Sequence, residues 1–426
     1  MTIEQLYDVY LQYPSVQTDT RKIKAGDIFF ALKGPSFNGN AFARQALDAG
    51  AAYAVVDEAG YAAGDKTILV EDVLTTLQLL AKQHRLQFSI PFIAITGSNG
   101  KTTTKELVHA VLSTQLVAYT TEGNLNNHIG VPLTILKIKK DAAVAVIEMG
   151  ANHQKEIAGY CSYTLPTHGI ITNAGKAHLE GFGGEEGVKK GKGELYDYLR
   201  AHNGTAFVMW DYDYLRKMSE GLPAIITYGT TGAGIVGTAV KSAPFLDVQF
   251  TNGIDELVHT QLVGDYNLPN ILCAAAVGNY FKIPSPLIKS AIEKYAPSNS
   301  RSQLIKRDSN TIILDAYNAN PSSMRAAIEN FAQLPETHKI LVLGGMAELG
   351  AESLEEHQQL VALIEGYQWG AVVLAGGDFL RIRHPYTSFE NALQAKEWFQ
   401  QQQFHHATIL IKGSRSMQME KVLEPL

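Results

Sequence analysis

The sequence has little cysteine, no surplus of positive charge and no long hydrophobic run, and each shortage excludes a class of protein. Its 426 residues include only two cysteines, Cys161 and Cys273, too few for a disulfide framework or a thiolate metal cluster. Both lie in apolar stretches, so we expect small buried core residues. No apolar run approaches the ~20 residues that cross a bilayer. Glu4 stands where a secretion signal would be basic. We therefore expect a cytoplasmic protein with no membrane insertion.

The balance of charge excludes partners that bind through a general electrostatic field. Lys and Arg number 36 against 42 Asp and Glu, a formal net charge of -6. Such a chain has no overall attraction for nucleic acid or anionic lipid. Any anionic ligand must therefore be held by local loops and a few placed cations. The hydrophobic content of 46% and charged content of 18% are ordinary for a globular protein.

The chain divides into three α/β segments, which we place at residues 1–88, 89–302 and 303–426. A length of 426 residues suggests two to four domains. Near-continuous apolar strands separated by amphipathic segments predict parallel sheets covered by helices on both faces. The predicted strands are 27–32, 52–56, 67–70, 90–97, 142–148, 169–173, 311–315, 339–343, 371–375 and 408–412. The predicted helices include 41–49, 73–84, 322–334 and 353–364.

The most informative segment is a glycine-rich loop between an apolar strand and a helical pattern. The loop is Gly97-Ser98-Asn99-Gly100-Lys101-Thr102-Thr103. Glycines let backbone N–H groups turn toward a polyphosphate, and the following helix adds the positive end of its dipole. Lys101 would neutralise the outer phosphates, and the Thr102 hydroxyl can ligate Mg²⁺. The alternative is a plain glycine-rich turn, but the order of strand, loop, Lys-Thr and helix favours phosphate binding.

Three later segments carry side chains that could hold a metal. Glu148 ends an apolar strand, where an open α/β sheet binds ligands, and its carboxylate suits Mg²⁺; a solvated turn residue is an equal alternative. His178 lies in a loop just past another strand and is a second candidate ligand. Lys189, Lys190 and Lys192 would ordinarily form a solvated helix face, unless one is buried with a lowered pKa. The neutral amine of such a lysine could capture CO₂ as a carbamate, an anionic metal ligand.

Several tracts, taken in order, resemble those of the Mur ligase family. They are Thr96-Gly-Ser-Asn-Gly-Lys-Thr-Thr-Thr, Gly123-Asn-Leu-Asn-Asn-His-Ile-Gly-Val-Pro, Glu148-Met-Gly-Ala-Asn, Ala177-His-Leu-Glu, Asp315-Ala-Tyr-Asn-Ala-Asn-Pro, Val342-Leu-Gly-Gly-Met-Ala-Glu-Leu-Gly and Lys412-Gly-Ser-Arg. Members of this family are ATP-dependent, amide-bond-forming ligases of peptidoglycan precursor synthesis. The resemblance implies a small UDP-sugar-binding domain, then a central P-loop ATPase-like domain. A C-terminal Rossmann-like domain would contribute to the binding of ATP and D-alanyl-D-alanine.

The resemblance also implies a role for each matching residue. Lys101 and the loop amides would hold the ATP phosphates, with Thr102 and Glu148 on one Mg²⁺. His178 would bind a second Mg²⁺ bridged by a carbamylated lysine, which the register before Gly193-Glu194 assigns to Lys192. The remaining ATP contacts would be Asn267 and Asn270 at the adenine, Arg301 at the phosphates and Asp315 at the ribose. The implied catalytic set is Lys101, Glu148, His178, Lys192 and Arg301. Outside the family, the asparagine pair would be interpreted as helix N-caps and Arg301 as a solvated linker cation.

Substrate contacts are implied at three further places. The pairs are Thr20 and Arg21 for the UDP-sugar, Asn318 and Asn320 for the incoming dipeptide, and Ser414 and Arg415 for a terminal carboxylate. An arginine suits the last role because its guanidinium offers a bidentate fork. Each pair has a simpler alternative. Residues 18–21 could form a turn cap, residues 317–321 a turn before a helix that starts at proline, and residues 414–415 a solvated turn.

The sequence departs from the family pattern at a few positions. Thr20 replaces the usual Ser but keeps the hydroxyl. Asn38 and Asn40 stand where Asp and His are common, so no contact with the nucleotide-sugar is assigned there. Tyr266 replaces a frequent His, and Gly345 replaces an Asp in a loop near the acceptor site. We assign neither of these two a role.

The implied reaction joins D-alanyl-D-alanine to UDP-N-acetylmuramoyl-tripeptide and converts ATP to ADP and phosphate. Phosphorylation would turn the substrate carboxylate into an acyl phosphate that an amine can attack. We expect a monomer, and the sequence indicates neither the general base nor the third residue of the tripeptide. Two other interpretations stay open. Another Mur-type or folylpolyglutamate-type ligase should lack Asp315-Ala-Tyr-Asn-Ala-Asn-Pro, and a non-catalytic ATP-binding regulator would need neither His178 nor Lys192.

Overall fold

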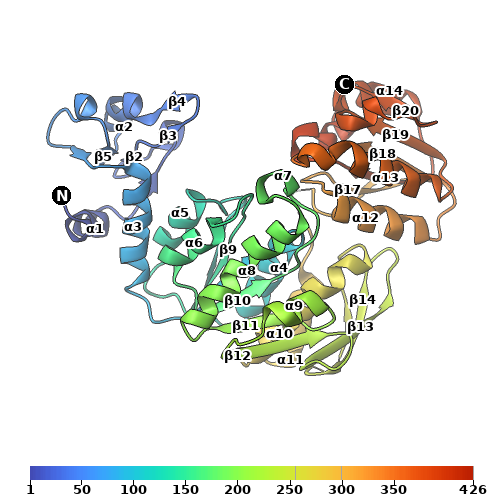
Figure 1. Ribbon diagram of the computed structural model, residues 1–426, viewed down its shortest axis with the longest axis horizontal. Helices are drawn as coiled ribbons and strands as arrows, with labels where there is room; N and C mark the ends of the chain where they lie inside the picture. The colour runs from blue at the N-terminus through green and yellow to red at the C-terminus, as the bar shows by residue number, and fades with distance from the viewer. Residues whose placement is uncertain (255, 299, 426) are drawn as a thin grey trace.

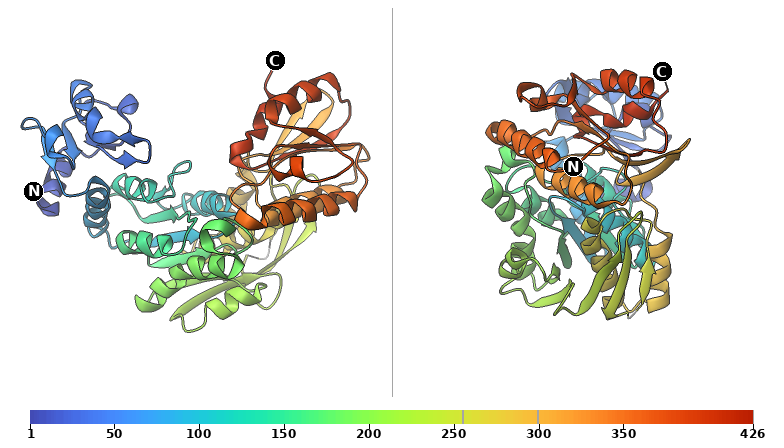
Figure 2. Two further views of the ribbon diagram at one scale, coloured as in Figure 1. Left: turned by 45° about the horizontal axis from the view of Figure 1, so that its top comes forward. Right: turned by 90° about the vertical axis from the view of Figure 1, so that its right-hand side faces the viewer.

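The computed structural model describes residues 1–254, 256–298 and 300–425, which form three α/β domains in chain order (Figure 1). The first and third domains rise from opposite ends of the same side of the second domain, and a second view shows the same arrangement (Figure 2). The N-terminus lies at the outer edge of the first domain and the C-terminus on the third. The predicted fold class of three α/β domains is therefore confirmed.

The first domain is built on a four-stranded parallel sheet of order β1-β2-β5-β6. The predicted helix at 41–49 is partly wrong, because Asn38 caps a 3-10 turn at Gly39–Phe42 before α2 begins. The predicted strand at 27–32 is shorter, since the chain turns into a small hairpin. The elements are α1 (Ile3–Gln12), β1 (Val16–Gln17), β2 (Ile28–Phe30), β3 (Lys33–Gly34), β4 (Phe37–Asn38), α2 (Ala43–Asp48), β5 (Tyr53–Val56), β6 (Thr67–Leu69) and α3 (Val73–Arg85).

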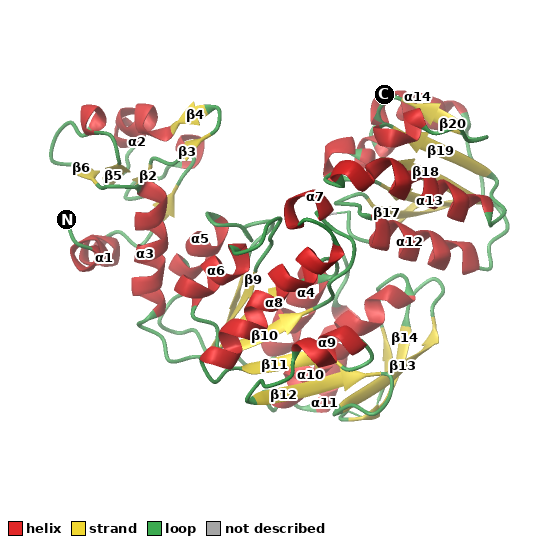
Figure 3. Ribbon diagram, in the orientation of Figure 1, coloured by secondary structure: helices red, strands yellow, loops and turns green. Residues whose placement is uncertain are grey.

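The second domain carries a nine-stranded sheet of order β15-β14-β13-β12-β11-β10-β7-β9-β8, with helices in front of and behind the strands (Figure 3). The elements up to β11 are β7 (Phe92–Thr96), α4 (Lys101–Leu112), β8 (Ala118–Thr120), α5 (Gly130–Leu136), β9 (Val144–Glu148), α6 (Glu156–Thr164), β10 (His168–Ile171), α7 (Leu179–Phe182), α8 (Glu185–Ala201) and β11 (Thr205–Met209). The rest are α9 (Asp213–Met218), β12 (Ala224–Gly229), β13 (Ile235–Lys241), β14 (Asp247–Asn252), β15 (Leu257–His259), α10 (Leu268–Tyr280) and α11 (Ser285–Lys294).

The expectation of fully parallel sheets is wrong at one edge of this domain. Strands β13, β14 and β15 pair antiparallel, because their short connections cannot contain the crossover that parallel pairing requires. The central strands β7, β9 and β10 are parallel and buried along their whole length. Their carboxyl ends therefore meet at one edge of the sheet, where α/β folds bind ligands.

The third domain has a six-stranded sheet of order β16-β17-β21-β18-β19-β20. Only the β16–β17 pair is antiparallel among these described pairings. Strand β21 lies between β17 and β18, so that Asp315 is directly opposite Lys412. The elements are β16 (Gln303–Arg307), β17 (Asn310–Asp315), α12 (Pro321–Gln333), β18 (Lys339–Gly344), α13 (Ser353–Glu365), β19 (Ala371–Ala375), β20 (Thr387–Phe389), α14 (Ala392–Gln401) and β21 (Thr408–Lys412).

One hydrophobic core cluster includes buried side chains from all three domains. Cys161 and Cys273 are both buried and unpaired, which confirms the prediction that they are small core residues. Within the described residues, no helix is both long enough and apolar enough to span a bilayer.

Candidate active site

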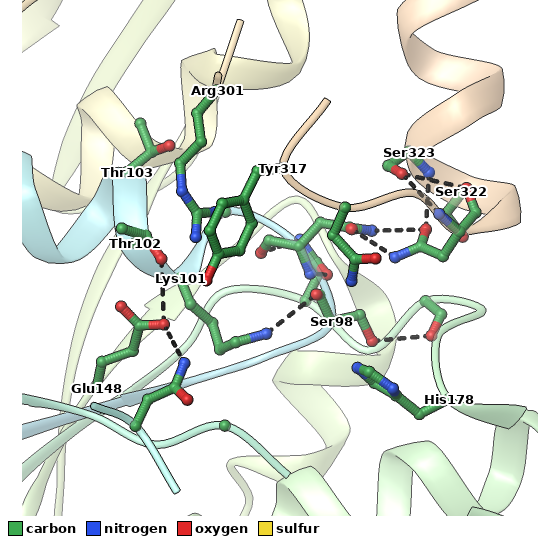
Figure 4. Close-up of a pocket in the computed structure, with 18 of the residues that line it drawn as sticks. Ser98, Lys101, Thr102, Thr103, Glu148, His178, Arg301, Tyr317, Ser322 and Ser323 are labelled. Atoms are coloured by element: carbon green, nitrogen blue, oxygen red, sulfur yellow. Dashed lines mark hydrogen bonds between the residues drawn. The ribbon is translucent and has the colours of Figure 1, made fainter. Parts of the chain in front are cut away.

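A cavity of about 890 Å³ lies between the second and third domains, where the carboxyl ends of the central strands meet the start of the third domain. Figure 4 shows the phosphate loop, the linker arginine and the start of α12 converging there. Fourteen of the predicted site residues line the cavity: Ser98, Asn99, Gly100, Lys101, Thr102, Thr103, Glu148, His178, Asn267, Asn270, Arg301, Asp315, Asn318 and Asn320.

The phosphate loop has the conformation that its glycines predict. Gly97 and Gly100 have φ of 144° and 80°, a region that other residues rarely adopt. A Cβ on Gly97 would lie 2.0 Å from Thr172 Oγ1, and one on Gly100 would lie 2.6 Å from Asn270 Oδ1. The side chain of Asn173 also orders the loop, because its Oδ1 accepts the backbone N–H of Asn99 at 2.9 Å. The loop is therefore a close-packed turn at the start of α4, with no room for side chains at the two glycines.

Lys101 folds back over this turn. Its Nζ donates to the carbonyl oxygens of Gly97 at 2.6 Å and Ser98 at 3.1 Å. The pKa of Lys101 is lowered to about 8, mainly by burial. The nearby Glu148 carboxylate opposes this shift, and the Arg301 guanidinium adds to it. The ammonium thus lies inside the curve of the loop, where an anion would neutralise it.

Glu148 is buried at the end of β9 and is not a solvated turn residue. Its Oε1 accepts hydrogen bonds from Thr102 Oγ1 at 3.1 Å and Asn126 Nδ2 at 2.7 Å. Its Oε2 is buried and has no partner in the described part of the chain. A carboxylate oxygen left free beside a hydroxyl is a donor set that fits Mg²⁺, which binds few protein oxygens and completes its shell with water and phosphate.

No group of three or more His, Cys, Asp or Glu side chains able to hold a metal occurs among the described residues. A cation in the cavity would therefore depend on hydroxyl, amide and substrate oxygens as well as on Glu148.

Of the three candidate lysines, Lys192 is the buried one. Its side chain is fully enclosed, whereas Lys190 is exposed and Lys189 is partly exposed. Lys192 Nζ donates to the carbonyl oxygen of Ala151 at 2.9 Å and lies 4.8 Å from the centre of the Phe182 ring. Burial lowers the pKa of Lys192 well below its usual value. The solvated-face alternative therefore holds for the other two lysines and is wrong for Lys192.

His178 makes a contact that the sequence did not suggest. It lies immediately before α7 with φ of 53°, and its Nδ1 is hydrogen-bonded to Glu348 Oε2 in the third domain. This hydrogen bond lowers the pKa of the Glu348 carboxyl. Lys192 contacts the Phe182 ring of α7 and donates to the Ala151 carbonyl oxygen, so His178 and Lys192 have different partners in this structure.

The asparagine pair does not cap α10, so that alternative is wrong. Asn267 precedes the helix without a side-chain cap, and its Nδ2 donates to the carbonyl oxygen of Val263 at 2.9 Å. Asn270 Nδ2 donates to Asn267 Oδ1 at 2.9 Å, while Asn270 Oδ1 accepts from Thr104 Oγ1 at 3.0 Å. The pair is buried beside Gly100 and lines the cavity.

The residues after β17 both start helix α12 and contact the glycine-rich loop. Asn320 caps α12 in a capping box with Ser323, and Pro321 is its first residue, as the simpler alternative predicted. Asn320 Nδ2 also donates to Asn99 Oδ1 at 2.7 Å, which joins α12 to the phosphate loop. Asn318 is exposed to the cavity. Asp315 accepts from Ser302 N at 3.0 Å and forms an ion pair with Lys412.

Four predicted substrate residues do not line this cavity: Thr20, Arg21, Ser414 and Arg415. The first two lie in a 3-10 turn of the first domain capped by Asp19, with Arg21 paired to Asp19 at 2.8 Å. Ser414 is buried and donates to the carbonyl oxygen of Gly345 at 2.7 Å. Arg415 is exposed and pairs with Glu420 at 2.8 Å. The simpler alternatives, a turn cap and a solvated turn, describe Arg21 and Arg415 in this structure.

The structure shows the surroundings of three positions that depart from the family pattern. A Cβ on Gly345 would lie 2.8 Å from Gly377 Cα, so the backbones leave no space for a side chain. Tyr266 lines the cavity, and its hydroxyl is hydrogen-bonded to Ser302 Oγ at 2.9 Å. In the first domain, Asn40 is fully buried and donates to Asp57 Oδ1 at 2.8 Å.

Sequence reasoning missed several residues at the cavity: Asn126, Asn173, Tyr317, Glu348 and Lys412 line it, and Lys176 lies between the lining residues Gly175 and His178. All of these except Asn173 and Lys176 lie within tracts that resemble the Mur ligases, and those two lie just after β10, so position past a strand end was the available signal. Their side chains contact residues that are distant in the sequence, and the sequence alone does not show which distant residues meet.

Three family models match the chain. They are described as Mur ligase family, catalytic domain, at residues 12–85, Mur ligase middle domain at 95–278, and Mur ligase, glutamate ligase domain at 300–415. The UDP-N-acetylmuramoyl-tripeptide–D-alanyl-D-alanine ligase of Bacillus subtilis (strain 168) is 36% identical over 96% of this chain and 92% of its own length.

Two solved structures are similar over the whole molecule. MurF from Acinetobacter baumannii superposes with a TM-score of 0.89 and 30% identity, covering 99% of this chain and 97% of the other. MurF ligase from Thermotoga maritima in complex with ADP has a TM-score of 0.86 and 27% identity, covering 97% of both chains.

Proposed function

The chain belongs to the Mur ligase family, and from this premise we propose that it is the ATP-dependent ligase that adds D-alanyl-D-alanine to UDP-N-acetylmuramoyl-tripeptide. The products are UDP-N-acetylmuramoyl-pentapeptide, ADP and phosphate. The observation that carries this proposal is the shared cavity, in which the phosphate loop and Glu148 of the second domain face Asp315 and Asn318 of the third. A related structure that holds ADP supports ATP as the nucleotide.

The phosphate loop would hold the ATP phosphates. Its amides and the start of α4 present partial positive charge, and the Lys101 ammonium would add a full positive charge beside the phosphates. Arg301 lies in the same cavity wall and would share the negative charge that develops as the γ-phosphate moves to the substrate carboxylate. Asn267 and Asn270 are assigned to the adenine and Asp315 to the ribose.

Thr102 and Glu148 would hold one Mg²⁺, and the free Oε2 of Glu148 fits that role. His178 and a carbamate on Lys192 are assigned to a second one. When bound, the ions would act as Lewis acids and neutralise part of the negative charge on the phosphates. The residues' own contribution is placement: Asn126 fixes the Glu148 carboxylate through a hydrogen bond, and burial lowers the pKa of the Lys192 amine, which favours the neutral form that a carbamate requires.

The three domains divide the substrates among themselves. Residues 1–88, with Thr20 and Arg21, are assigned to the UDP-sugar, residues 89–302 to ATP, and residues 303–426 to the dipeptide through Asn318, Asn320, Ser414 and Arg415. Closure of the domains would exclude water from the acyl phosphate. ATP is a cytoplasmic substrate, so the proposed reaction belongs to the cytoplasm. One chain supplies every named residue, and the proposal requires no partner subunit.

The direct test incubates the purified chain with ATP, Mg²⁺, the UDP-tripeptide and a panel of amines, and follows both products. We expect pentapeptide only with D-alanyl-D-alanine, with ¹⁸O passing from the substrate carboxylate to inorganic phosphate. Lys101→Ala should lose at least about 100-fold in kcat, whereas Lys190→Ala should keep wild-type activity. Glutamate or diamino-acid addition without use of the dipeptide would disprove the assignment.

Lys192 has its own test. Lys192→Ala should be nearly inactive, and a short-chain carboxylate such as acetate or propionate should restore part of the activity by replacing the carbamate oxygens. The same additive should leave Lys101→Ala inactive, which controls for a general salt effect. A fully active Lys192→Ala variant would end the carbamate assignment.

A further inference from the structure

The linker between the second and third domains has an unusual conformation around Arg301. The residues on both sides of it, Ser300 and Ser302, have φ of 56° and 49°, in the left-handed region that L-residues other than glycine seldom adopt. Such conformations persist only where surrounding contacts hold them, and they concentrate at functional sites. The contacts that hold this linker therefore indicate what its shape is for.

Three of these contacts come from the last residue of β17 and the segment that follows it. The backbone N–H of Tyr317 donates to the carbonyl oxygen of Ser300 at 3.2 Å. The Arg301 guanidinium carbon lies 3.6 Å from the centre of the Tyr317 ring, in a cation–π contact. Asp315 Oδ1 accepts the backbone N–H of Ser302 at 3.0 Å. Each linker residue is thus fixed by Tyr317 or Asp315.

Lys412 supports this segment from the neighbouring strand. It faces Asp315 across the β17–β21 register, and its side chain is only 2% exposed. Its Nζ donates to Asp315 Oδ2 at 2.5 Å and to the carbonyl oxygen of Asn318 at 3.3 Å. A lysine is rarely buried unless it is paired, so the ion pair at the strand ends is a fixed anchor for residues 315–318.

The stacked Arg301 points toward the phosphate loop. Arg301 lines the same cavity as Lys101 and Thr102, and Figure 4 shows its guanidinium beside the Tyr317 ring, near Thr102 and Lys101. Tyr317 is itself only partly buried and faces the cavity, unlike the aromatic residues of the core. A ring needed only for packing would not have to lie against the guanidinium in the cavity wall.

We propose that Tyr317 is the positioning residue for Arg301, holding its guanidinium at the phosphate loop, and that the Asp315–Lys412 pair anchors Tyr317. The inference rests on the proposed function, because Arg301 is assigned there to the ATP phosphates. Its consequence is a mechanical link: Asn318, assigned to the incoming dipeptide, follows Tyr317 directly. A change at the acceptor loop would then reach the arginine that stabilises phosphoryl transfer.

The test is a double-mutant cycle on kcat with Tyr317→Leu and Arg301→Ala. We expect Tyr317→Leu to lower kcat at least about tenfold, and to have less than a twofold further effect in the Arg301→Ala background. Tyr317→Phe keeps the ring and should retain kcat within about threefold of wild type. Thermal unfolding of each variant separates this coupling from a loss of stability.

A matched control uses Arg325, an exposed arginine of α12 paired with Glu329 at 3.4 Å. Arg325→Ala should leave kcat unchanged and should combine with Tyr317→Leu without coupling. Lys412→Met should resemble Tyr317→Leu in its coupling to Arg301, because it frees Asp315 and the segment that follows.

Two results would overturn the proposal. One is a full, independent effect of Tyr317→Leu in the Arg301→Ala background; the other is a Tyr317→Phe variant as poor as Tyr317→Leu. The same double-mutant cycle can be measured without turnover, from the affinity of each variant for ATP determined by calorimetry in the absence of acceptor. If the ATP affinities showed this coupling between Tyr317 and Arg301 but the wild-type enzyme formed no pentapeptide, the proposed function would fail and the positioning role would stand.

Discussion

One buried polar atom at the cavity, Glu148 Oε2, lacks the hydrogen-bond partner that most buried polar side chains have. Most are matched, as in Lys105, whose buried Nζ donates to the carbonyl oxygen of Thr121 at 2.8 Å. Five buried side-chain atoms in the described part of the chain have no partner, and only Glu148 Oε2 belongs to a cavity-lining residue. An unmatched buried polar atom costs about 1–3 kcal/mol. At Glu148 that cost has a functional explanation, because a cation would remove it.

His168 should make the protein less stable in acid. The ring is buried among Phe207, Tyr280 and Phe281, and burial lowers its pKa to about 4 from 6.5. A lowered folded-state pKa means that the unfolded chain binds the proton first, so stability falls as pH drops from about 6.5 toward 4. From pH 7 to pH 5 the expected loss is about 2 kcal/mol in the free energy of unfolding.

Chemical denaturation at the two pH values measures this effect. His168→Phe should remove this contribution and reduce the difference between pH 7 and pH 5 by that amount. An unchanged pH dependence in the variant would show that His168 is not the responsible group.

Gly345 should not accept the aspartate that is common in the family. The Cβ of Gly345→Asp would lie 2.8 Å from Gly377 Cα and 3.0 Å from the Gly376 carbonyl oxygen, so the backbone would have to move. Overpacking of this kind costs about 1–3 kcal/mol. Gly60→Asp is the control, because nothing lies within 4 Å of its Cβ. Thermal unfolding should show a loss for Gly345→Asp alone; equal melting temperatures would contradict the steric argument.

Helix α3 connects the first and second domains and packs against α5 and α6. It begins at Val73, as predicted, after a cap by Asp72, and its last residue, Arg85, is buried. The Arg85 guanidinium donates to the carbonyl oxygens of Thr164 at 2.9 Å and Leu165 at 3.0 Å, at the end of α6. A side chain at the end of α3 thus donates hydrogen bonds to the free carbonyl oxygens at the end of α6, and these bonds attach the first domain to the second.

Arg85→Met should weaken this junction. The substitution removes the donor for three carbonyl oxygens, since Phe88 O also accepts from Arg85 at 2.6 Å, and we expect a loss of about 1–3 kcal/mol. Arg44→Met is the control, because Arg44 is 84% exposed and pairs only with Asp48 on its own helix. Urea unfolding measures both. A variant as stable as the control would show that hydrophobic contacts alone hold α3.

The third domain is fastened to the second by polar contacts around the cavity. Lys176 Nζ lies 2.5 Å from Glu356 Oε1, whose side chain is 7% exposed, and Lys176 N donates to Ser322 Oγ at 3.0 Å. His178–Glu348 and Asn99–Asn320 complete the set. Asn99, His178, Asn320, Ser322 and Glu348 also line the cavity, so contacts that attach the third domain help to form the cavity wall.

Lys176→Met should loosen the third domain. It leaves the buried Glu356 carboxylate without its nearest cation, a loss of about 1–3 kcal/mol that shifts the molecule toward a detached domain. Small-angle scattering should show a larger radius of gyration, and the KM for ATP should rise. Replacing both partners, Lys176→Met with Glu356→Leu, should be closer to wild type, because no unpaired charge remains.

Arg381→Met, at an exposed pair with Asp378 on the third domain, is the control and should change neither quantity. A Lys176→Met variant with the scattering profile of wild type would show that this ion pair does not hold the domains together.

The sequence by itself determined the three α/β segments, the strand boundaries at β19 and β21, and the glycine-rich turn between β7 and α4. These are local properties, because apolar runs, glycines and a Lys-Thr pair act within a few neighbours. Tertiary structure alone decided which lysine is buried, that His178 meets Glu348, that β13–β15 turn antiparallel, and that Tyr317 and Lys412 hold the linker at Arg301. Each of these depends on partners brought together from distant residues, and burial, charge and pairing of that kind exist only once the chain has folded.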